Sequence, residues 1–251
     1  MSIYNGDNFI YNAIQSLQNQ SFKDFEIIII DDGSRDKSNS ILLEMIQDKL
    51  IDVLIVNVAN IGLTKSLNLG VKNARGSLIA RQDVDDISLS NRLKDQIEFI
   101  KKYDLIGGLT INVYTNNVQK DVVSNPNALK TIFLKSPFAH STAMFVKDRF
   151  IKIGGYNESF PVSQDFELWM RFAESGNVGI LNKPAIKRLV HDDMISRKLP
   201  FRQLYYSHKA RMMHLHSSRF LPIYYMLQQV AIILLPRPIK ELIKKIKKEK
   251  K

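Results

Sequence analysis

Residues 25–34 read Phe-Glu-Ile-Ile-Ile-Ile-Asp-Asp-Gly-Ser, and they carry the clearest indication of the fold class. Its first six residues form a continuous, mostly apolar run rich in β-branched isoleucine. A strand buried on both faces of a parallel sheet has this composition, whereas a strand with one face in water alternates. The run stops at two aspartates and a Gly-Ser pair, which predicts an acidic turn at the carboxyl end of a buried strand.

Before and after this stretch, candidate strands alternate with candidate helices along the chain. Residues 51–58 and 77–80 are strand candidates, while apolar residues repeat at helical spacing within 7–20, 41–46 and 63–74. Ser34 can cap the second helix and Gly76 can end the third. This order predicts an α/β domain with a Rossmann-like, doubly wound, mostly parallel sheet flanked by helices. Ligands of such sheets bind at the carboxyl ends of the strands.

The first strand candidate is short. Ser2-Ile3-Tyr4 has the character of the last residues of a strand, and Asn5-Gly6 that of the turn after it. The apolar first half of such a strand is missing. Either the start at Met1 is late or the first strand is a stub, which would disturb a pocket around Tyr4.

The second half of the chain changes character. Strands are expected at 109–114 and 142–146, a helix at 165–174, and two edge strands at 177–181 and 186–190. We expect one domain over residues 1–200, with a ligand-binding half at about 1–104 and a second half at about 105–200. Residues 201–251 are expected to form a helical, basic tail.

Composition excludes several classes of protein. The 251 residues are 45% hydrophobic and 24% charged, as in a folded domain. The absence of cysteine excludes disulfides, zinc-thiolate sites and a thiol nucleophile. The net charge is +11, but the last 15 residues hold eight Lys and Arg against two Glu. Because the body is only mildly basic, we expect no nucleic-acid partner.

The tail predicts a place at a membrane surface. The longest apolar stretch, residues 220–235, is shorter than the about 20 residues that a spanning helix needs. Residues 1–20 are polar, so we expect no signal peptide. Ile239, Leu242, Ile243 and Ile246 form one stripe of a helix whose other face is rich in lysine. Such a helix binds an anionic bilayer, and the alternative is a solvated helix or a basic tail for nucleic acid. We therefore expect a cytoplasmic protein at the inner face of the cell membrane.

Two acidic turns are candidate binding sites. Asp31 and Asp32 can contact a base or ribose, or can form a helix-capping turn. Asp83-Val84-Asp85-Asp86 places three carboxylates within four residues, which repel one another unless a cation or donor groups compensate. This cluster predicts a site for Mg²⁺ or Mn²⁺ bound to diphosphate oxygens, and the alternative is a solvated acidic loop.

Three further residues have a possible chemical role. Asp165 opens a helix and can act as a general base on an acceptor hydroxyl, or can simply cap the helix over a core that contains Trp169. His191 follows an apolar strand and can bind a metal or diphosphate, or can be a surface residue. His140 can line an acceptor pocket or can pack in the interior.

These motifs together resemble the family 2 glycosyltransferases, which are inverting enzymes with the GT-A fold. The resemblance covers roughly residues 2–200, in order and in spacing. It is carried by Ile3-Tyr4-Asn5-Gly6, Gln20-Ser21-Phe22, Ile30-Asp31-Asp32-Gly33-Ser34, Asn60-Ile61-Gly62-Leu63, Asp83-Val84-Asp85-Asp86, Gly154-Gly155-Tyr156 and Gln164-Asp165.

The resemblance implies a role for each matching residue. Asp165 would be the catalytic base, preceded here by Gln164 where the family has a glutamate, and Asp85 would hold the metal with His191 nearby. The other implied positions form two groups: the donor and its nucleoside would be held by Tyr4, Asp31, Asp32, Lys65, Arg81 and Asp83, and the acceptor pocket would be lined by His140, Gln164 and Trp169.

The resemblance also implies a reaction. A sugar would pass from a nucleotide-diphosphate donor, with UDP expected, to a hydroxyl of a glycan or lipid-linked acceptor in cell-surface polysaccharide synthesis, with Mn²⁺ or Mg²⁺ as cofactor. Three alternatives remain open: a catalytically impaired, sugar-nucleotide-binding relative with a truncated first strand, a nucleotidyltransferase, and a glycosidase. A nucleotidyltransferase needs a Gly-rich, basic loop for triphosphate, and residues 5–8 read Asn-Gly-Asp-Asn.

Overall fold

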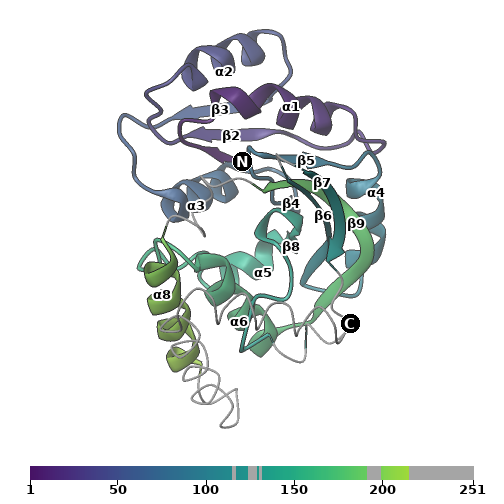
Figure 1. Cartoon of the computed structure of the whole chain (residues 1–251), viewed down its shortest axis with the longest axis vertical. Coiled ribbons are helices and arrows are strands. Elements are labelled where there is room, and N and C mark those ends of the chain that lie inside the picture. Colours follow the sequence, from purple (N-terminus) through teal and green to yellow (C-terminus); the bar gives the residue numbers. More distant parts are fainter. Residues whose placement is uncertain (115–116, 124–128, 130–131, 191–198, 215–251) are drawn as a thin grey trace.

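A three-stranded parallel sheet and a six-stranded mixed sheet, with helices around them, build the protein (Figure 1). The computed structural model describes all residues except 115–116, 124–128, 130–131, 191–198 and 215–251. The basic stripe of the expected tail and His191 therefore lie outside the described residues.

The parallel sheet has the order β1-β2-β3, with bounds Ser2–Ile3, Ile28–Asp31 and Val53–Val56. The isoleucine run forms the central strand, because both of its faces are covered. Ile29 packs in one apolar cluster with residues of α1 (Asp7–Gln18) and α2 (Ser38–Gln47). On the other face, Ile30 lies against Gly70 of α3 (Leu63–Asn73). The prediction of a strand buried on both faces is confirmed.

Two helix boundaries differ from those expected. α2 begins at Ser38, and Ser34 does not cap it because its hydroxyl accepts the backbone N–H of Asn5 at 3.0 Å. α3 ends at Asn73, three residues before Gly76. The N–H of Gly76 instead donates to the carboxylate of Glu26 at 3.0 Å.

The mixed sheet has the order β4-β8-β6-β9-β5, with β7 paired to β6. Its strands are β4 Leu78–Ala80, β5 Asp86–Ser88, β6 Leu105–Tyr114, β7 Asn117–Val123, β8 Met144–Val146 and β9 Val178–Val190. β4 pairs antiparallel with β8, so it belongs to this sheet and not to the parallel one. The mostly parallel character expected of the whole sheet is thus found in β1–β3, while only the β6–β9 pairing is parallel here.

The two expected edge strands at 177–181 and 186–190 are one long inner strand, so that prediction was wrong. β9 lies between β6 and β5. Its register with β6 shifts where Gly108 opposes Leu181 and Leu109 opposes Pro184. This irregularity lets the strand pass through a proline that cannot donate to a ladder.

Helices cover both faces of the mixed sheet. α4 (Arg92–Ile100) packs with Ile106 and Met144 on one face. α5 (Lys147–Lys152) and α6 (Gln164–Ser175) pack on the other, around the fully buried Trp169 and Phe145. α8 (Pro200–Met213) packs against α6. Within the described residues, no helix combines the length and the apolarity needed to cross a membrane.

Candidate active site

Four segments bring titratable side chains into one electrostatic environment. These are the turn after β4, the start of β5, the short 3₁₀ helix at His140–Thr142 and the first turn of α6. The charges of Asp83 and Arg81 both act on Asp165 and on His140. The structure therefore joins the second acidic turn to the helix that carries the expected base.

Asp31 is held by its own turn and by the first turn of α2. Only 1% of it is exposed, and it accepts the backbone N–H of Ser34 at 3.0 Å and Nδ2 of Asn39 at 3.1 Å. Gly33 adopts a φ of +73°, and a Cβ there would lie 2.7 Å from the backbone carbon of Ala59. The turn thus needs glycine for its backbone conformation and for this close approach.

Asp32 holds the loop that leads into α3. It is 2% exposed. It accepts Nδ2 of Asn57 at 2.9 Å, the N–H of Ile61 at 3.0 Å and the N–H of Gly62 at 2.9 Å. A nucleoside contact of Asp31 or Asp32 stays a prediction, and the observed partners of both carboxylates are protein donors.

The turn after β1 is fastened to the turn after β2. Tyr4 lies at this edge of the sheet with 46% of its surface exposed. The bonds that fasten the two turns are Asn5 N to Ser34 Oγ at 3.0 Å, Gly6 N to Ser38 Oγ at 2.9 Å, Asp7 N to Asp36 Oδ2 at 3.1 Å and Arg35 N to Asn5 Oδ1 at 2.8 Å. Tyr4 is therefore presented to solvent from a rigid loop pair.

Arg81 and Asp83 form an ion pair at the end of β4. Arg81 is 4% exposed and donates to the carboxylate of Asp83 at 2.5 Å. Burial opposes ionisation of Asp83, but the charges of Arg81 and Arg188 lower its pKa below the usual range. Asp83 is therefore an anion, and a third of its side chain remains exposed.

Asp86 follows the same turn, but its pKa is shifted in the opposite direction to that of Asp83. It is 2% exposed, and burial, followed by the charge of Asp83, raises its pKa to about 7. Arg188 lies opposite it across the β5–β9 pair and partly offsets this rise. One carboxyl oxygen of Asp86 has no hydrogen-bond partner among the described residues. Asp85, next to it, is half-buried.

His140 is neutral and hydrogen-bonded. Its Nε2 lies 2.7 Å from the hydroxyl of Tyr156, and its ring meets that of Trp169 edge-on at 5.9 Å. Burial and the charge of Arg81 lower the pKa of His140 to about 3. Trp169 itself is fully buried in the main apolar cluster, so it packs against the ring of His140 and does not line an open pocket.

Asp165 is a carboxyl group with a raised pKa. It is half-buried in the first turn of α6. Burial raises its pKa, the charge of Asp83 raises it further, and the backbone N–H of Phe166 lowers it. A carboxylate whose pKa is raised toward neutrality takes up a proton more readily than an ordinary aspartate.

The remaining predicted residues are less central. Lys65 is exposed on α3, and Gln164 is buried beside Asp165. The sequence analysis assigned no individual role to two residues of this site. Tyr156 appeared only within the motif Gly154-Gly155-Tyr156. Arg188 is the positive charge that acts on Asp83 and Asp86. The position of Tyr156 in a matching motif could have indicated it, whereas Arg188 is found only through the β5–β9 pairing.

The acidic turn offers carboxylates for a divalent cation but not a complete set of ligands. Across the part of the chain that the structure describes, no group of three or more His, Cys, Asp or Glu side chains could hold a metal ion. Asp83 and Asp85 offer two carboxylates from one turn. Mg²⁺ is commonly bound by one or two carboxylates together with substrate phosphates and water. The residues present fit that kind of site.

Comparison with known proteins agrees with this geometry. Residues 1–155 match the family model described as glycosyl transferase family 2. The O-antigen biosynthesis glycosyltransferase WbnJ of Escherichia coli is 33% identical over 178 residues, which cover 68% of this chain and 69% of WbnJ. An uncharacterized glycosyltransferase of Rickettsia typhi, RT0329, is 28% identical over 202 residues, 76% of this chain and 62% of its own length.

A solved structure shares the fold. The crystal structure of S. aureus TarS 1–349 in complex with UDP-GlcNAc superimposes with a TM-score of 0.71 at 18% identity, covering 89% of this chain and 67% of that one. The family model matches well over half of the residues, and the sheet and helices follow the same plan. The chain therefore belongs to glycosyltransferase family 2 and has the GT-A fold.

Proposed function

We propose that the protein transfers a sugar from a nucleotide-diphosphate donor, with UDP as the nucleotide, to an acceptor hydroxyl with inversion at the anomeric carbon. One observation carries the proposal: Asp165, a carboxyl group whose pKa is raised, lies in the field of the Arg81–Asp83 pair. The TarS complex with UDP-GlcNAc supports the choice of donor, because that protein has the same fold.

The reaction assigns one role to each group. Asp165 takes the proton of the acceptor hydroxyl as its oxygen bonds to the anomeric carbon. The bond from that carbon to the diphosphate oxygen breaks, and the nucleoside diphosphate leaves with the electron pair. Because the acceptor attacks opposite the leaving group, a single displacement inverts the carbon. The transfer needs no covalent intermediate.

We propose that Asp85, with Asp83 beside it, holds Mn²⁺ or Mg²⁺ together with the donor diphosphate. His191 remains a candidate ligand that lies outside the described residues. Such a cation, when bound, stabilises negative charge on the departing diphosphate. Arg81 adds a fixed positive charge at the same turn and holds Asp83 in place through their ion pair.

The neutral His140 and Tyr156 form the acceptor side of the proposed site. Their hydrogen bond at 2.7 Å orients both rings, and the ring of Trp169 packs edge-on against that of His140. An imidazole that stays uncharged down to about pH 3 can exchange hydrogen bonds with a sugar hydroxyl without adding charge. Gln164 is placed on the same helix turn as the base.

The test is product formation from a panel of nucleotide sugars with Mn²⁺, using a membrane-extracted glycolipid fraction as acceptor. Asp165→Asn should lower kcat by about 10³-fold, because general base catalysis contributes 10²–10⁴-fold. Asp48→Asn, an exposed residue after α2, is the matched control and should leave the rate unchanged. The anomeric configuration of the product, read by NMR coupling constants, should be opposite to that of the donor.

Two results would overturn the proposal. One is transfer by Asp165→Asn at the wild-type rate. The other is synthesis of a nucleotide sugar from nucleoside triphosphate and sugar phosphate, which would identify a nucleotidyltransferase. Retention of the donor configuration would remove inversion from the proposal and leave transfer in place.

We further propose that the enzyme works at the cytoplasmic face of an anionic membrane, on a glycan or lipid-linked acceptor. The amphipathic sequence of residues 237–251 supports this placement. So does α8, where Phe201, Tyr205 and Met212 are exposed at helical spacing on one stripe. The full chain should sediment with vesicles that contain phosphatidylglycerol, and deletion of residues 237–251 should release it. Equal sedimentation of both forms would contradict the placement.

A further inference from the structure

Arg92, the first residue of α4, is a buried cation held by four uncharged acceptors. It is 2% exposed, and burial lowers the pKa of its guanidinium to about 10, so it stays positive at neutral pH. Its Nη2 donates to the carbonyl of Arg81 at 2.6 Å, and its Nη1 donates to Oε1 of Gln82 at 2.8 Å and to Oγ of Ser88 at 2.9 Å. Its Nε donates to Oε1 of Gln96 at 3.0 Å. Burying a charge is costly, and these bonds compensate the cost.

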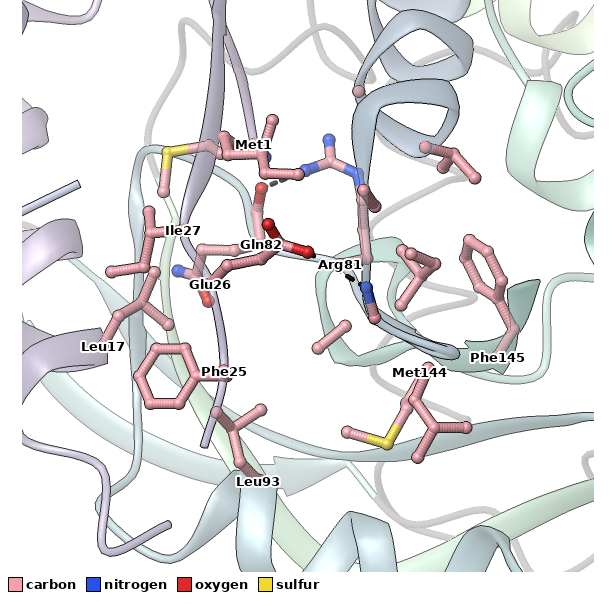
Figure 2. Close-up of a pocket in the computed structure, with 18 of the residues that line it drawn as sticks. Met1, Leu17, Phe25, Glu26, Ile27, Arg81, Gln82, Leu93, Met144 and Phe145 are labelled. Atoms are coloured by element: carbon pink, nitrogen blue, oxygen red, sulfur yellow. Dashed lines mark hydrogen bonds between the residues drawn. The ribbon is translucent and has the colours of Figure 1, made fainter. Parts of the chain in front are cut away.

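The acceptors of Arg92 lie on both sides of the acidic turn at residues 83–86. Arg92 lines a cavity of about 620 Å³ between the two sheets, and Figure 2 shows Arg81 and Gln82 at the same cavity. These two residues directly precede Asp83, and Ser88 follows the turn at the end of β5. One guanidinium therefore bonds to the chain before the turn and after it.

The guanidinium sets the orientation of the Gln82 amide. Because arginine carries only donors, an amide bonded to it must present its oxygen, and the hydroxyl of Ser88 donates to that same oxygen at 2.8 Å. The amide nitrogen is thereby directed to the turn, where it donates to the carbonyls of Asp83 at 3.0 Å and Asp86 at 2.7 Å. A single side chain thus closes, from both ends, the turn that contains Asp85.

Gln96, one helical turn further along α4, is oriented in the same way. Its amide oxygen accepts Nε of Arg92, so its amide nitrogen points elsewhere and donates to the carbonyl of Thr142 at 2.7 Å. Thr142 ends the 3₁₀ helix that begins at His140, and both Gln96 and Thr142 are fully buried. Arg92 is therefore connected to the proposed donor side through Gln82 and to the proposed acceptor side through Gln96.

We propose that Arg92 is a positioning residue for the transfer reaction: it holds the turn at residues 83–86 and the 3₁₀ helix at His140–Thr142 in one fixed arrangement. The inference rests on the proposed function, because these two segments are its donor and acceptor sides. Since only 2% of Arg92 is exposed, it acts through the amides of Gln82 and Gln96 and not by contact with a substrate.

Lysine cannot reproduce these contacts. The donors of an ammonium radiate from one atom, whereas the planar guanidinium of Arg92 reaches two amides, a hydroxyl and a carbonyl at once. Arg92→Lys therefore keeps the charge but leaves at least one of the two amides without its donor. A residue that orients a ligand-binding group in this way typically contributes about 10–100-fold to affinity or activity.

The first test measures the binding of UDP with Mn²⁺ by titration calorimetry, together with transfer kinetics. In Arg92→Lys the Kd for UDP and the KM for the donor should both rise about 10–100-fold. Arg211→Lys is the matched control for binding, because Arg211 is also a buried arginine and donates to the carbonyl of Leu134 at 2.6 Å. It should lower the melting temperature and leave the Kd for UDP unchanged, which separates positioning from loss of stability.

Two milder substitutions test the two branches, and they decide the question even where Arg92→Lys does not fold. Gln82→Met should raise the Kd for UDP about tenfold and leave the KM for the acceptor unchanged. Gln96→Met should raise the KM for the acceptor about tenfold and leave the Kd for UDP unchanged. A general loss of stability would not divide between the substrates in this way.

Amide hydrogen exchange without substrate separates this inference from the proposed function. The N–H of Asp86 donates to Asp83 in the turn, and the N–H of Ala143 donates to His140 at 3.1 Å. Both should exchange about tenfold faster in Arg92→Lys than in the wild type. If the wild type binds no UDP, the proposed function fails and these rates alone decide whether Arg92 positions the two segments.

Either of two outcomes overturns the inference. In the first, Arg92→Lys folds and keeps the wild-type Kd for UDP, KM for both substrates and exchange rates. In the second, Gln82→Met and Gln96→Met change the donor and acceptor constants alike, which would reduce the network to a general contribution to stability.

Discussion

The turns after β2 and β4 are both acidic, but their carboxylates differ in how many protein hydrogen-bond donors they have. After β2, Asp31 and Asp32 are nearly saturated by protein donors. After β4, Asp83 is paired with Arg81, while Asp86 is buried with a raised pKa and has one oxygen without a partner among the described residues.

The difference separates two uses of the same side chain. Carboxylates that accept several N–H groups stabilise the fold and orient loops, so their loss is expected in stability. Carboxylates that crowd together in a buried turn destabilise it unless a ligand compensates, so their loss is expected in activity. The second pattern is typical of functional sites. Substitutions in the two turns should reveal this difference, with the largest effect at Asp85.

Asp85→Ala should separate activity from stability most strongly. Transfer should fall by about 10³-fold, because the cation would lose its ligand and charge on the leaving group would be less stabilised. The melting temperature should change little, because the half-buried carboxylate of Asp85 repels that of Asp86 and its loss removes this repulsion. Donor turnover and calorimetry measure the two quantities, and a large loss of stability without loss of rate would reverse the assignment of this turn.

Asp32→Ala should show the opposite pattern. It leaves the backbone N–H groups of Ile61 and Gly62 and the amide of Asn57 without their acceptor. The expected cost is about 2–4 kcal/mol, which lowers the melting temperature of a chain of this size by roughly 5–15 °C. Calorimetry on this variant and on Asp48→Asn checks it. An unchanged melting temperature would show that the loop does not depend on Asp32.

Asp86 should make stability fall with rising pH. The folded protein holds its proton up to about pH 7, whereas an unfolded chain releases it near pH 4. Between these values the folded state binds more protons, so the free energy of unfolding decreases, by at most about 1.4 kcal/mol per pH unit. The charges that act on it include those of Asp83, Asp85, Arg188 and the buried Arg92. Urea unfolding in EDTA between pH 4.5 and 7.5 should show a steeper slope than in Asp86→Asn, and parallel profiles would refute it.

Asn39→Ala should give the smallest effect, about 1 kcal/mol. It removes one of the donors of Asp31 at 3.1 Å and leaves the bond from Ser34 in place. Urea unfolding measures the loss, with Asn73→Ala, a bond to a helix carbonyl of α3, as an exposed amide control. A loss above 3 kcal/mol would mean that Asp31 is held mainly by its side-chain partner.

Local patterns in the sequence predicted the parallel half of the fold well. The isoleucine run became β2 and the helical stripes became α1 and α3, because each signal lies within one element. The mixed sheet was less predictable. The pairing of β4 with β8, and the single strand that spans Pro184, depend on contacts between residues far apart in the chain. Periodicity carries no information about such contacts.

The site followed the same division. Asp83 and Asp165 were found from motifs, and the structure places them in one field. Motifs alone could not show that Asp32 accepts hydrogen bonds from the loop before α3. Nor could they show that the ring of Trp169 contacts that of His140, or that the charge of Arg188 acts on Asp83. Each of these depends on burial and pairing. A carboxylate in a motif therefore predicts where an acidic side chain lies in the fold. The number of its protein hydrogen-bond partners indicates whether it stabilises the fold or is available to a ligand.

The fastening of the turns after β1 and β2 affects how a ligand would bind at this edge. Four backbone N–H groups there are already held by side chains of the facing turn. Their ordering occurs when the protein folds, so a nucleotide arriving at Tyr4 would meet a surface with little conformational freedom left to lose. Association there should be governed by how fast the partners meet, with little delay from loop rearrangement.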